Sequence, residues 1–243
     1  MKPYYQDSAV TIYYGDCLEI MPKLEAESVD LVLTDPPYGV DYVTNHRARG
    51  DVLVHEIAGD SSLKTYIASI YHAARLLKQD RHWYSFAAPL STSGELLEAL
   101  ALAGLSYKNL LVWDKQNQSV GDLTGDYGRA WEPIIFAHKG RRDLFGSRDP
   151  NILRFSRGSG ATYEHPTQKP VKMMQYLIQT STLQGELIVE PFMGGGGVVK
   201  AAKDLGRRAI GIEIEERYCE IAAKRCAQEV LDLSFAGTEG ANG

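Results

Sequence analysis

The chain has 243 residues, of which 44% are hydrophobic and 23% charged, and its formal net charge is -5. This apolar content is typical of a folded domain and excludes a disordered or fibrous chain. No apolar run approaches the length of about 18 residues that spans a bilayer, and residues 1–7 lack a signal-peptide core, so we expect neither a membrane span nor export. Cys17, Cys219 and Cys226 form no CxxC pair, which indicates a reduced cytoplasmic protein without a disulfide framework or a zinc site.

Acidic and basic residues are unevenly distributed along the chain. Residues 213–243 hold seven acids and three bases, whereas residues 138–157 hold six bases and two acids. This asymmetry predicts a molecule with one side that faces phosphate. Charge alone is equally consistent with an ordinary solvated loop at 138–157.

Short apolar strands alternate with segments of helical periodicity. In chain order, we predict a strand at 11–14, a helix at 18–24, strand 28–33, helix 61–78, strand 82–87, helix 93–103, strands 107–113 and 132–137, a helix after Pro170, strand 186–189, helix 198–205, strand 209–214 and helix 215–230. This alternation predicts an α/β doubly wound fold, with a mostly parallel sheet and helices on both faces. Pro133 suggests that the strand at 132–137 begins there or lies at an edge of the sheet.

Two polar segments that contain Gly and Arg interrupt this pattern, at about 39–60 and 114–164. Long insertions on an α/β scaffold usually carry function. We therefore expect a single domain over 1–234 with two inserted segments, followed by a flexible tail at 235–243.

A glycine-rich motif, EPFMGGGG, occupies 190–197 between a predicted strand and a predicted helix. Such a turn lets a ligand approach the backbone and the helix N-terminus. Glu213 ends the next strand, at a place where nucleotide sites have an acid that accepts hydrogen bonds from ribose hydroxyls. The motif lacks a full GxGxxG and a P-loop lysine, so the predicted ligand has a ribose and need not have a pyrophosphate. A turn made only for packing is the alternative, but four consecutive glycines cost much chain entropy.

A second motif, DPPY at 35–38, directly follows the apolar strand 28–33. The carboxyl ends of strands line the ligand crevice of a doubly wound sheet, and the two prolines fix the backbone. A carboxylate on a rigid turn beside an aromatic ring can hold an amino group and stack on a planar ring. Taken alone, the motif is equally consistent with a plain turn.

Together the motifs resemble the β class of site-specific DNA amino-methyltransferases, the DPPY type that methylates N6 of adenine or N4 of cytosine. The matching segments, which span roughly 11–226, are YGDCL (14–18), DPPY (35–38), EPIIFAHK (132–139), HPTQKP (165–170), PFMG (191–194) and RRAIGIE (207–213). The resemblance implies a Rossmann-like S-adenosylmethionine-dependent methyltransferase fold with a circularly permuted motif order. It also implies a mostly parallel seven-stranded sheet of order 3-2-1-4-5-7-6, in which 132–137 is antiparallel.

The resemblance implies that the catalytic residues are Asp35, Pro36, Pro37 and Tyr38. Asp35 and the Pro36 carbonyl would hold the exocyclic amine of a flipped base, and Tyr38 would stack on its ring. This positioning aims the amine nitrogen at an activated methyl group. No metal is needed, and no cluster of His, Cys and acids suggests one.

The implied cofactor is S-adenosyl-L-methionine. The expected cofactor-binding residues are Asp16, Cys17, Asp35, His165, Thr167, Lys169, Glu190, Pro191, Phe192, Gly194, Gly196 and Glu213. Among them Glu213 would bind the ribose, Asp16 the adenine amino group, and Thr167 with Lys169 the amino-acid end. Small buried packing for Cys17 and loop orientation for His165 are the alternatives. The chain departs from the family at Glu190, usually Asp, and at Gly195 and Gly197, usually Ser or Thr, which places cofactor affinity in question.

The segments 41–57 and 114–164 are expected to face DNA. The candidate contacts are Arg47, Arg49, Lys139, Arg141, Arg142, Arg148, Arg154 and Arg157. Most would touch phosphates and a minority would read base edges. Tyr127, Trp131 and Tyr163 either stack on bases or pack in the core and rim.

The resemblance thus implies N6-adenine methylation of double-stranded DNA in the cytoplasm of a prokaryotic or phage-infected cell, without a membrane partner. It leaves a homodimer and a cognate restriction endonuclease open. N4-cytosine methylation is the nearest alternative, and DPPY, in place of SPPY, favours adenine. The others are a DNA-binding relative without turnover and a dinucleotide oxidoreductase, which would need GxGxxG and leave DPPY and HPTQKP unexplained.

Overall fold

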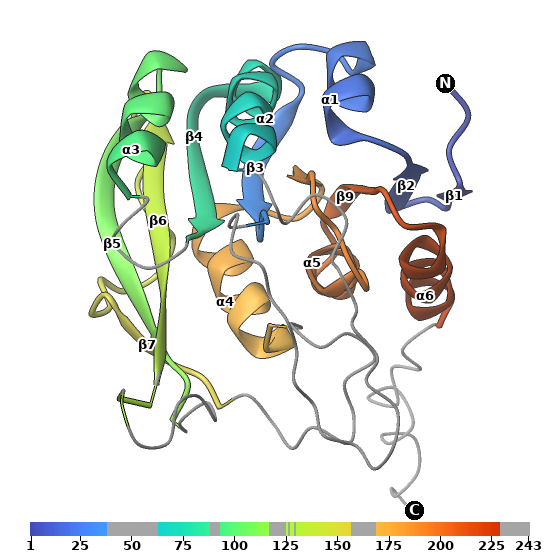
Figure 1. Ribbon diagram of the computed structural model, residues 1–243. Coiled ribbons are helices and arrows are strands. Elements are labelled where there is room, and N and C mark those ends of the chain that lie inside the picture. The colour runs from blue at the N-terminus through green and yellow to red at the C-terminus, as the bar shows by residue number, and fades with distance from the viewer. Residues whose placement is uncertain are drawn as a thin grey trace, which may run out of the picture.

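A computed structural model describes residues 1–37, 63–87, 93–116, 125, 127–128, 130–156 and 169–228. The strands in these ranges are β1 (Tyr5–Gln6), β2 (Val10–Tyr14), β3 (Val29–Thr34), β4 (Leu77–Phe86), β5 (Ser106–Asp114), β6 (Trp131–Lys139), β7 (Ile152–Arg154), β8 (Leu187–Glu190) and β9 (Arg208–Glu213). The helices are α1 (Cys17–Ile20), the 3-10 helix η1 (Met21–Lys23), α2 (Leu63–Leu76), α3 (Ser93–Leu102), α4 (Val171–Ser181), α5 (Gly197–Asp204) and α6 (Glu216–Ala227) (Figure 1).

The described strands form one nine-stranded sheet in the order β1-β2-β9-β8-β3-β4-β6-β5-β7. Neighbours from β2 to β4 run parallel, whereas β6 is antiparallel to both β4 and β5. With β8 as strand 1, the run from β2 to β5 has the implied order 3-2-1-4-5-7-6. The methyltransferase fold class is confirmed, but the count of seven strands is wrong, because the short strands β1 and β7 extend the two edges.

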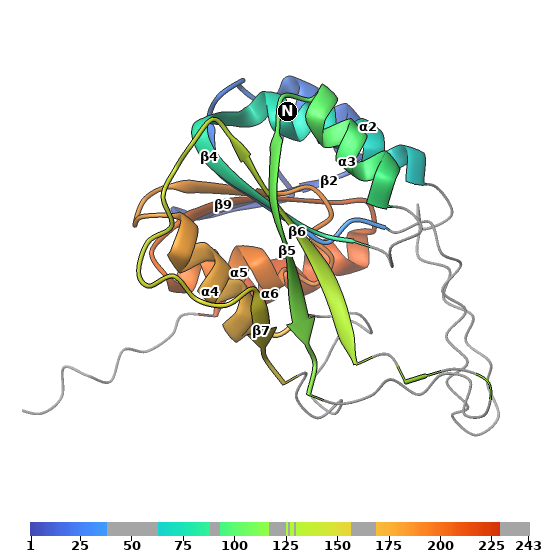
Figure 2. The same ribbon diagram turned by 90° about the vertical axis from the view of Figure 1, so that its left-hand side faces the viewer.

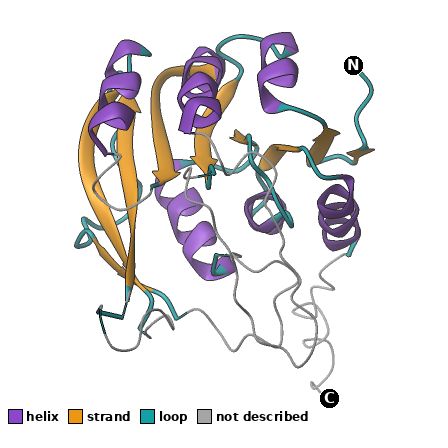
Figure 3. Ribbon diagram, viewed as in Figure 1, coloured by secondary structure: helices purple, strands orange, loops and turns teal. Residues whose placement is uncertain are grey.

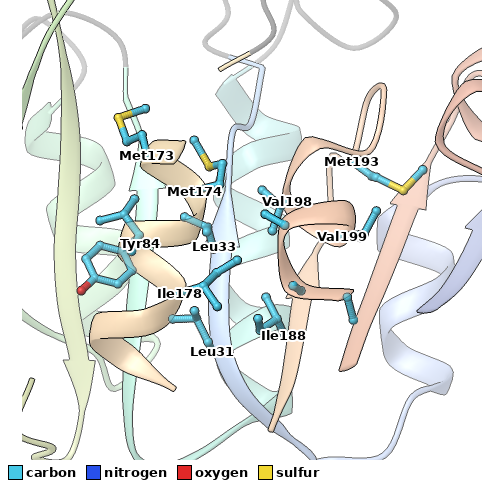
Figure 4. Packing of buried hydrophobic residues seen from close by; sticks show 14 of the residues in the cluster. Leu31, Leu33, Tyr84, Met173, Met174, Ile178, Ile188, Met193, Val198 and Val199 are labelled. Atoms are coloured by element: carbon cyan, nitrogen blue, oxygen red, sulfur yellow. The ribbon is translucent and has the colours of Figure 1, made fainter. Parts of the chain in front are cut away.

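Helices cover both faces of the sheet, with α1, α2 and α3 on one face and α4, α5 and α6 on the other (Figures 1, 2 and 3). Every residue of β3 is buried: Leu31 and Leu33 pack toward α4 and α5, while Val32 packs on the opposite side (Figure 4). Burial on both faces explains why the apolar residues Leu31, Val32 and Leu33 follow one another in this strand. Within the described ranges, no helix is long and apolar enough to span a bilayer.

Two predicted strands differ from the structure in instructive ways. β4 begins at Leu77, five residues before the predicted start. The prediction missed these residues because residues 78–81 are polar and show no apolar alternation. Pro133 does not mark an edge, since β6 lies between β4 and β5. Its carbonyl accepts a hydrogen bond from Ala87, the residue after β4, so the missing N–H falls where the β4–β6 ladder ends.

His82 of β4 and His138 of β6 form a buried pair, with ring centroids 4.5 Å apart. The ring nitrogens of His82 lie 2.8 Å from Ser181 Oγ and 2.9 Å from the Arg142 carbonyl oxygen. Burial, helped by the neighbouring His82 ring, lowers the pKa of His138 to about 4. Burial also lowers the pKa of His82. The charged groups that face the pair are Arg81, Lys108, Arg141, Arg142 and Asp143.

The buried pair of His82 and His138 should make the free energy of unfolding decrease as the pH falls. A histidine whose folded pKa lies below its unfolded value of about 6.5 contributes stability that is complete above that value and is lost as the pH falls toward 4. We expect His138→Phe to flatten the decline of unfolding free energy between pH 6.5 and 4, measured by urea denaturation. His72→Phe on α2, outside the pair, is the control and should keep the parent's decline. Parallel curves for the parent and His138→Phe would contradict this assignment.

Candidate active site

The candidate site lies where four neighbouring strands end. Asp35 follows β3, the glycine-rich loop follows β8, Glu213 ends β9 and Asp16 follows β2. These strands are adjacent and parallel in the sheet, so their carboxyl ends meet at one edge. The topology therefore brings together motifs that are far apart in the sequence.

Glu213 is a buried acid held by two backbone N–H groups. Gly194 donates to one carboxylate oxygen at 2.7 Å and Glu215 donates to the other at 2.8 Å. Burial raises the pKa of Glu213, and these hydrogen bonds act in the opposite direction. Each carboxylate oxygen can accept a second hydrogen bond, so the group fits a pair of hydroxyls such as those of a ribose.

The glycine-rich loop packs closely on β9 and α6. Met193 donates to the Ile212 carbonyl at 2.9 Å, and Arg225 Nη1 donates to the Gly195 carbonyl at 2.5 Å. Gly196 has φ of 79°, and a Cβ there would lie 2.6 Å from the Ala222 Cβ, so only glycine fits. A Cβ on Gly197 would meet nothing within 4 Å, so the serine or threonine usual in the family would have room. The N-cap position of α5 is Gly196, which has no side chain, so the helix begins without a side-chain cap.

Glu190 joins the ends of β8 and β3. It is 2% exposed, and its Oε1 accepts hydrogen bonds from Thr34 Oγ1 at 2.8 Å and from the Phe192 N–H at 3.1 Å. Burial raises the pKa of Glu190 well above its usual range, and nearby Asp35 adds to the shift. Glu190 therefore connects the ends of two strands at the site.

The raised pKa of Glu190 predicts a stabilising substitution. A buried acid with a raised folded pKa contributes stability that is complete below its unfolded pKa and is lost as the pH rises through the folded value. Glu190→Gln keeps an oxygen acceptor and removes the ionisation. We expect the variant to have a higher Tm than the parent at pH 8, and the difference to shrink toward pH 4.5. A Tm difference that is independent of pH would contradict the raised pKa.

Asp35 is paired with Lys169. The Lys169 Nζ lies 2.8 Å from Asp35 Oδ2, 3.1 Å from Glu132 Oε2 and 4.8 Å from the centre of the Phe86 ring. Lys115 Nζ lies 2.7 Å from the other oxygen of Glu132. The structure thus places Lys169, expected at the cofactor, beside Asp35, the carboxylate predicted to be catalytic.

The opposite charges of Asp35, Lys169, Glu132 and Lys115 stabilise one another's ionised forms. Burial by itself lowers the pKa of Lys169, but Asp35 and Glu132 outweigh burial, so the pKa is raised. Burial raises the pKa of Glu132, but Lys169 and Lys115 outweigh it and the pKa is lowered. Sequence analysis did not single out Lys115, Glu132 or Thr34. For Glu132, the signal was an acid at the start of an apolar strand.

The other residues that the sequence predicted for the site are partly described by the structure. Asp16 caps α1 by accepting a hydrogen bond from the Leu18 N–H at 2.8 Å. Cys17 is buried, and burial, with Asp16 nearby, raises the pKa of its thiol to about 12, which favours its packing role. Pro36 and Pro37 follow Asp35, and Pro191 and Phe192 lie in the loop after β8. Tyr38, His165 and Thr167 lie outside the described residues.

Residues 146–224 match the family model N6_N4_Mtase, described as a DNA methylase. The chain is 32% identical over 213 residues to YubD of Escherichia coli (strain K12), with 88% of each chain covered. This chain belongs to the DNA methylase family. The methylase is also 25% identical over 255 residues to the DNA adenine methyltransferase YhdJ of Escherichia coli (strain K12), with 91% of this chain and 84% of YhdJ covered. Its structure resembles the crystal structure of the M1.HpyAVI-SAM complex, with 25% sequence identity and a TM-score of 0.70. The match covers 90% of this chain and 100% of that chain.

Among the described residues of this DNA methylase, the basic candidates for DNA contact are divided between the two edges of the sheet. Arg154 ends β7 beside Asp114, at the same edge as Asp35, and is 70% exposed. Lys139 and Arg142 lie at the opposite edge and have internal partners. Lys139 donates to the carbonyls of Ala74 in α2 and Leu77 in β4, and Arg142 donates to the Glu186 carboxylate. Arg141, 88% exposed, lies beside them.

DNA contacts by these residues stay predictions. Arg148 lies in the connection between β6 and β7, and Tyr127 and Trp131 are exposed. Arg47, Arg49, Arg157 and Tyr163 lie outside the described residues.

Proposed function

We propose that this chain is a site-specific DNA methyltransferase that uses S-adenosyl-L-methionine to methylate the N6 amine of a flipped adenine in duplex DNA. The supporting observation is the meeting of Asp35, the glycine-rich loop and Glu213 at one edge of the sheet. Membership of the DNA methylase family and similarity to the adenine methyltransferase YhdJ support the same reaction.

The residues of the site divide the work between cofactor and base. Glu213 accepts hydrogen bonds from ribose hydroxyls, and the glycine-rich loop allows close approach to the backbone. The bound cofactor supplies a methyl group activated by its sulfonium. Asp35 and the Pro36 carbonyl accept the two N–H groups of the exocyclic amine, which orients the nitrogen lone pair. Tyr38 stacks on the base, which repays part of the few kcal/mol that flipping costs.

The test combines calorimetry with methyl transfer. The protein should bind S-adenosylmethionine, transfer its labelled methyl group to duplex DNA and leave N6-methyladenine in a fixed sequence word. Modification-sensitive sequencing of DNA from expressing cells reads the base and the word together. N4-methylcytosine would assign the enzyme to the other exocyclic amine. Cofactor and DNA binding without transfer would identify a relative that has lost turnover.

Arg154 is proposed to contact a DNA phosphate, because it is exposed at the edge that carries Asp35. Each lost phosphate contact flattens the slope of log affinity against log salt by about 0.9. Arg154→Gln should therefore reduce the slope by about that amount. Arg208→Gln is the matched control, because Arg208 is exposed at the start of β9 on the opposite edge, and it should leave the slope unchanged. Equal slopes for the parent and Arg154→Gln would place Arg154 away from the duplex.

The same proposal places the enzyme on DNA in the cytoplasm of a prokaryotic or phage-infected cell. It leaves a homodimer and a cognate restriction endonuclease open. Sedimentation with and without DNA tests the dimer. Digestion of host DNA after loss of the methyltransferase tests for the endonuclease.

A further inference from the structure

Four charged side chains of alternating sign form a continuous line at the active edge: Lys115, Glu132, Lys169 and Asp35. We refer to them as the charge chain. Lys115 directly follows β5, Glu132 lies at the start of β6, Lys169 precedes α4 and Asp35 follows β3. The successive N···O distances are 2.7, 3.1 and 2.8 Å.

The two lysines of the charge chain are sheltered from water, whereas the side chains of Glu132 and Asp35 are each one quarter exposed. The Lys169 side chain is 10% exposed, and its ammonium group also lies over the ring of Phe86. A charge in such surroundings is costly unless it is paired, so removal of one member leaves its neighbour with an uncompensated charge. The geometry of each member therefore depends on the next.

We propose that Lys169 is a positioning residue for the catalytic Asp35, and that Glu132 and Lys115 hold Lys169 in place. This inference rests on the proposed function and adds residues to the same site. Because the ammonium group holds Asp35 Oδ2, it limits rotation of the carboxylate that must receive the target amine. Lys115 and Glu132 lie at the two ends of the connection between β5 and β6, which is expected to face DNA. The charge chain thus joins that connection to the reacting group.

The first test separates positioning from cofactor binding. Single-turnover methyl transfer is measured with cofactor and duplex both saturating, and cofactor Kd is measured by calorimetry. Lys169→Met should lower the rate by about 100-fold, the cost of a misplacement near 1 Å, and change the cofactor Kd by less than about threefold. Lys169→Arg keeps a cation and should recover the rate to within about tenfold of the parent.

The opposite result would overturn the inference. If Lys169 binds the amino-acid end of the cofactor, Lys169→Met should weaken cofactor binding by about tenfold or more and transfer at the parental rate once saturated. Lys78→Met is the matched control, because Lys78 pairs at 2.9 Å with Asp30 near the start of the same strand, at the opposite edge. Its rate should equal that of the parent. Failure of the parent itself to transfer methyl groups would refute the proposed function and is distinguishable from both outcomes.

A double-mutant cycle tests whether Glu132 acts through Lys169. Glu132→Gln should lower the rate by about tenfold in the parent, but have little effect in the Lys169→Met background, since coupled residues are non-additive. The same loss in both backgrounds would show that Glu132 acts independently. If Lys169→Met does not fold, as judged by circular dichroism, Lys169→Arg and Glu132→Gln replace it. Parental rates in both variants would then refute the proposed positioning role of the charge chain.

Discussion

Replacement of Asp35 by asparagine should lower methyl transfer by at least about 100-fold, within the range associated with loss of a positioned proton acceptor. Asparagine keeps the shape of the side chain but replaces one acceptor oxygen by a donor, which opposes the N–H groups of the target amine. Asp35→Ala should be at least as inactive. The measurement is single-turnover transfer of labelled methyl to duplex DNA.

Two controls separate this catalytic effect from misfolding. Both Asp35 variants should bind duplex DNA within a few-fold of the parent, because phosphate contacts supply most of that affinity. Asp204→Asn, at the end of α5 and away from the site, should retain parental turnover. Turnover of Asp35→Asn within tenfold of the parent would remove Asp35 from the catalytic role.

Gly196→Ala should destabilise the protein by about 2–5 kcal/mol. The left-handed backbone costs an alanine about 1–2 kcal/mol, and overpacking against α6 adds about 1–3 kcal/mol. The new methyl group would lie 2.6 Å from the Ala222 Cβ and 3.1 Å from its Cα, so backbone must move. Urea denaturation measures the loss, and calorimetry should show weaker cofactor binding, because the displaced loop carries Gly194, whose N–H donates to Glu213.

The adjacent glycine supplies a matched control. Gly197 is the first residue of α5, and a Cβ there meets nothing within 4 Å. Gly197→Ala should be neutral or stabilising by up to about 1 kcal/mol, since alanine is the better helix former. Equal destabilisation by both substitutions would mean that neither the backbone angle nor the contact with α6 explains the effect.

Much of the fold was predictable because its central strands carry strong patterns. β3 is buried on both faces and reads as an apolar run, and the motifs after β3 and β8 then follow from the topology of parallel strands. β1 and β7 were missed because two or three residues show no periodicity. The start of β4 was missed because Lys78 to Arg81 are polar.

The contacts of Lys169 were not predictable from the sequence. Glu132 lies 17 residues after Lys115 and 37 residues before Lys169, so only the three-dimensional arrangement of β5, β6 and α4 brings them together. The basic segment shows the same limit. β6 runs antiparallel and carries residues 139–142 to the far edge, whereas β7 returns Arg154 to the active edge.

The strand order also determines when the central sheet can be completed during synthesis of the chain. β8 and β9 lie between β2 and β3 in the sheet, yet β8 begins 153 residues after β3 ends, at Leu187 and Thr34 respectively (Figure 1). At ribosomal rates that interval lasts roughly ten to thirty seconds. Leu31 and Leu33 lack cover on one face until α4 and then α5 are made, and β2 lacks its long partner until β9 is made. The nascent chain therefore leaves this apolar surface uncovered for most of the interval, and premature termination before β9 yields a polypeptide that lacks Glu213 of the candidate site.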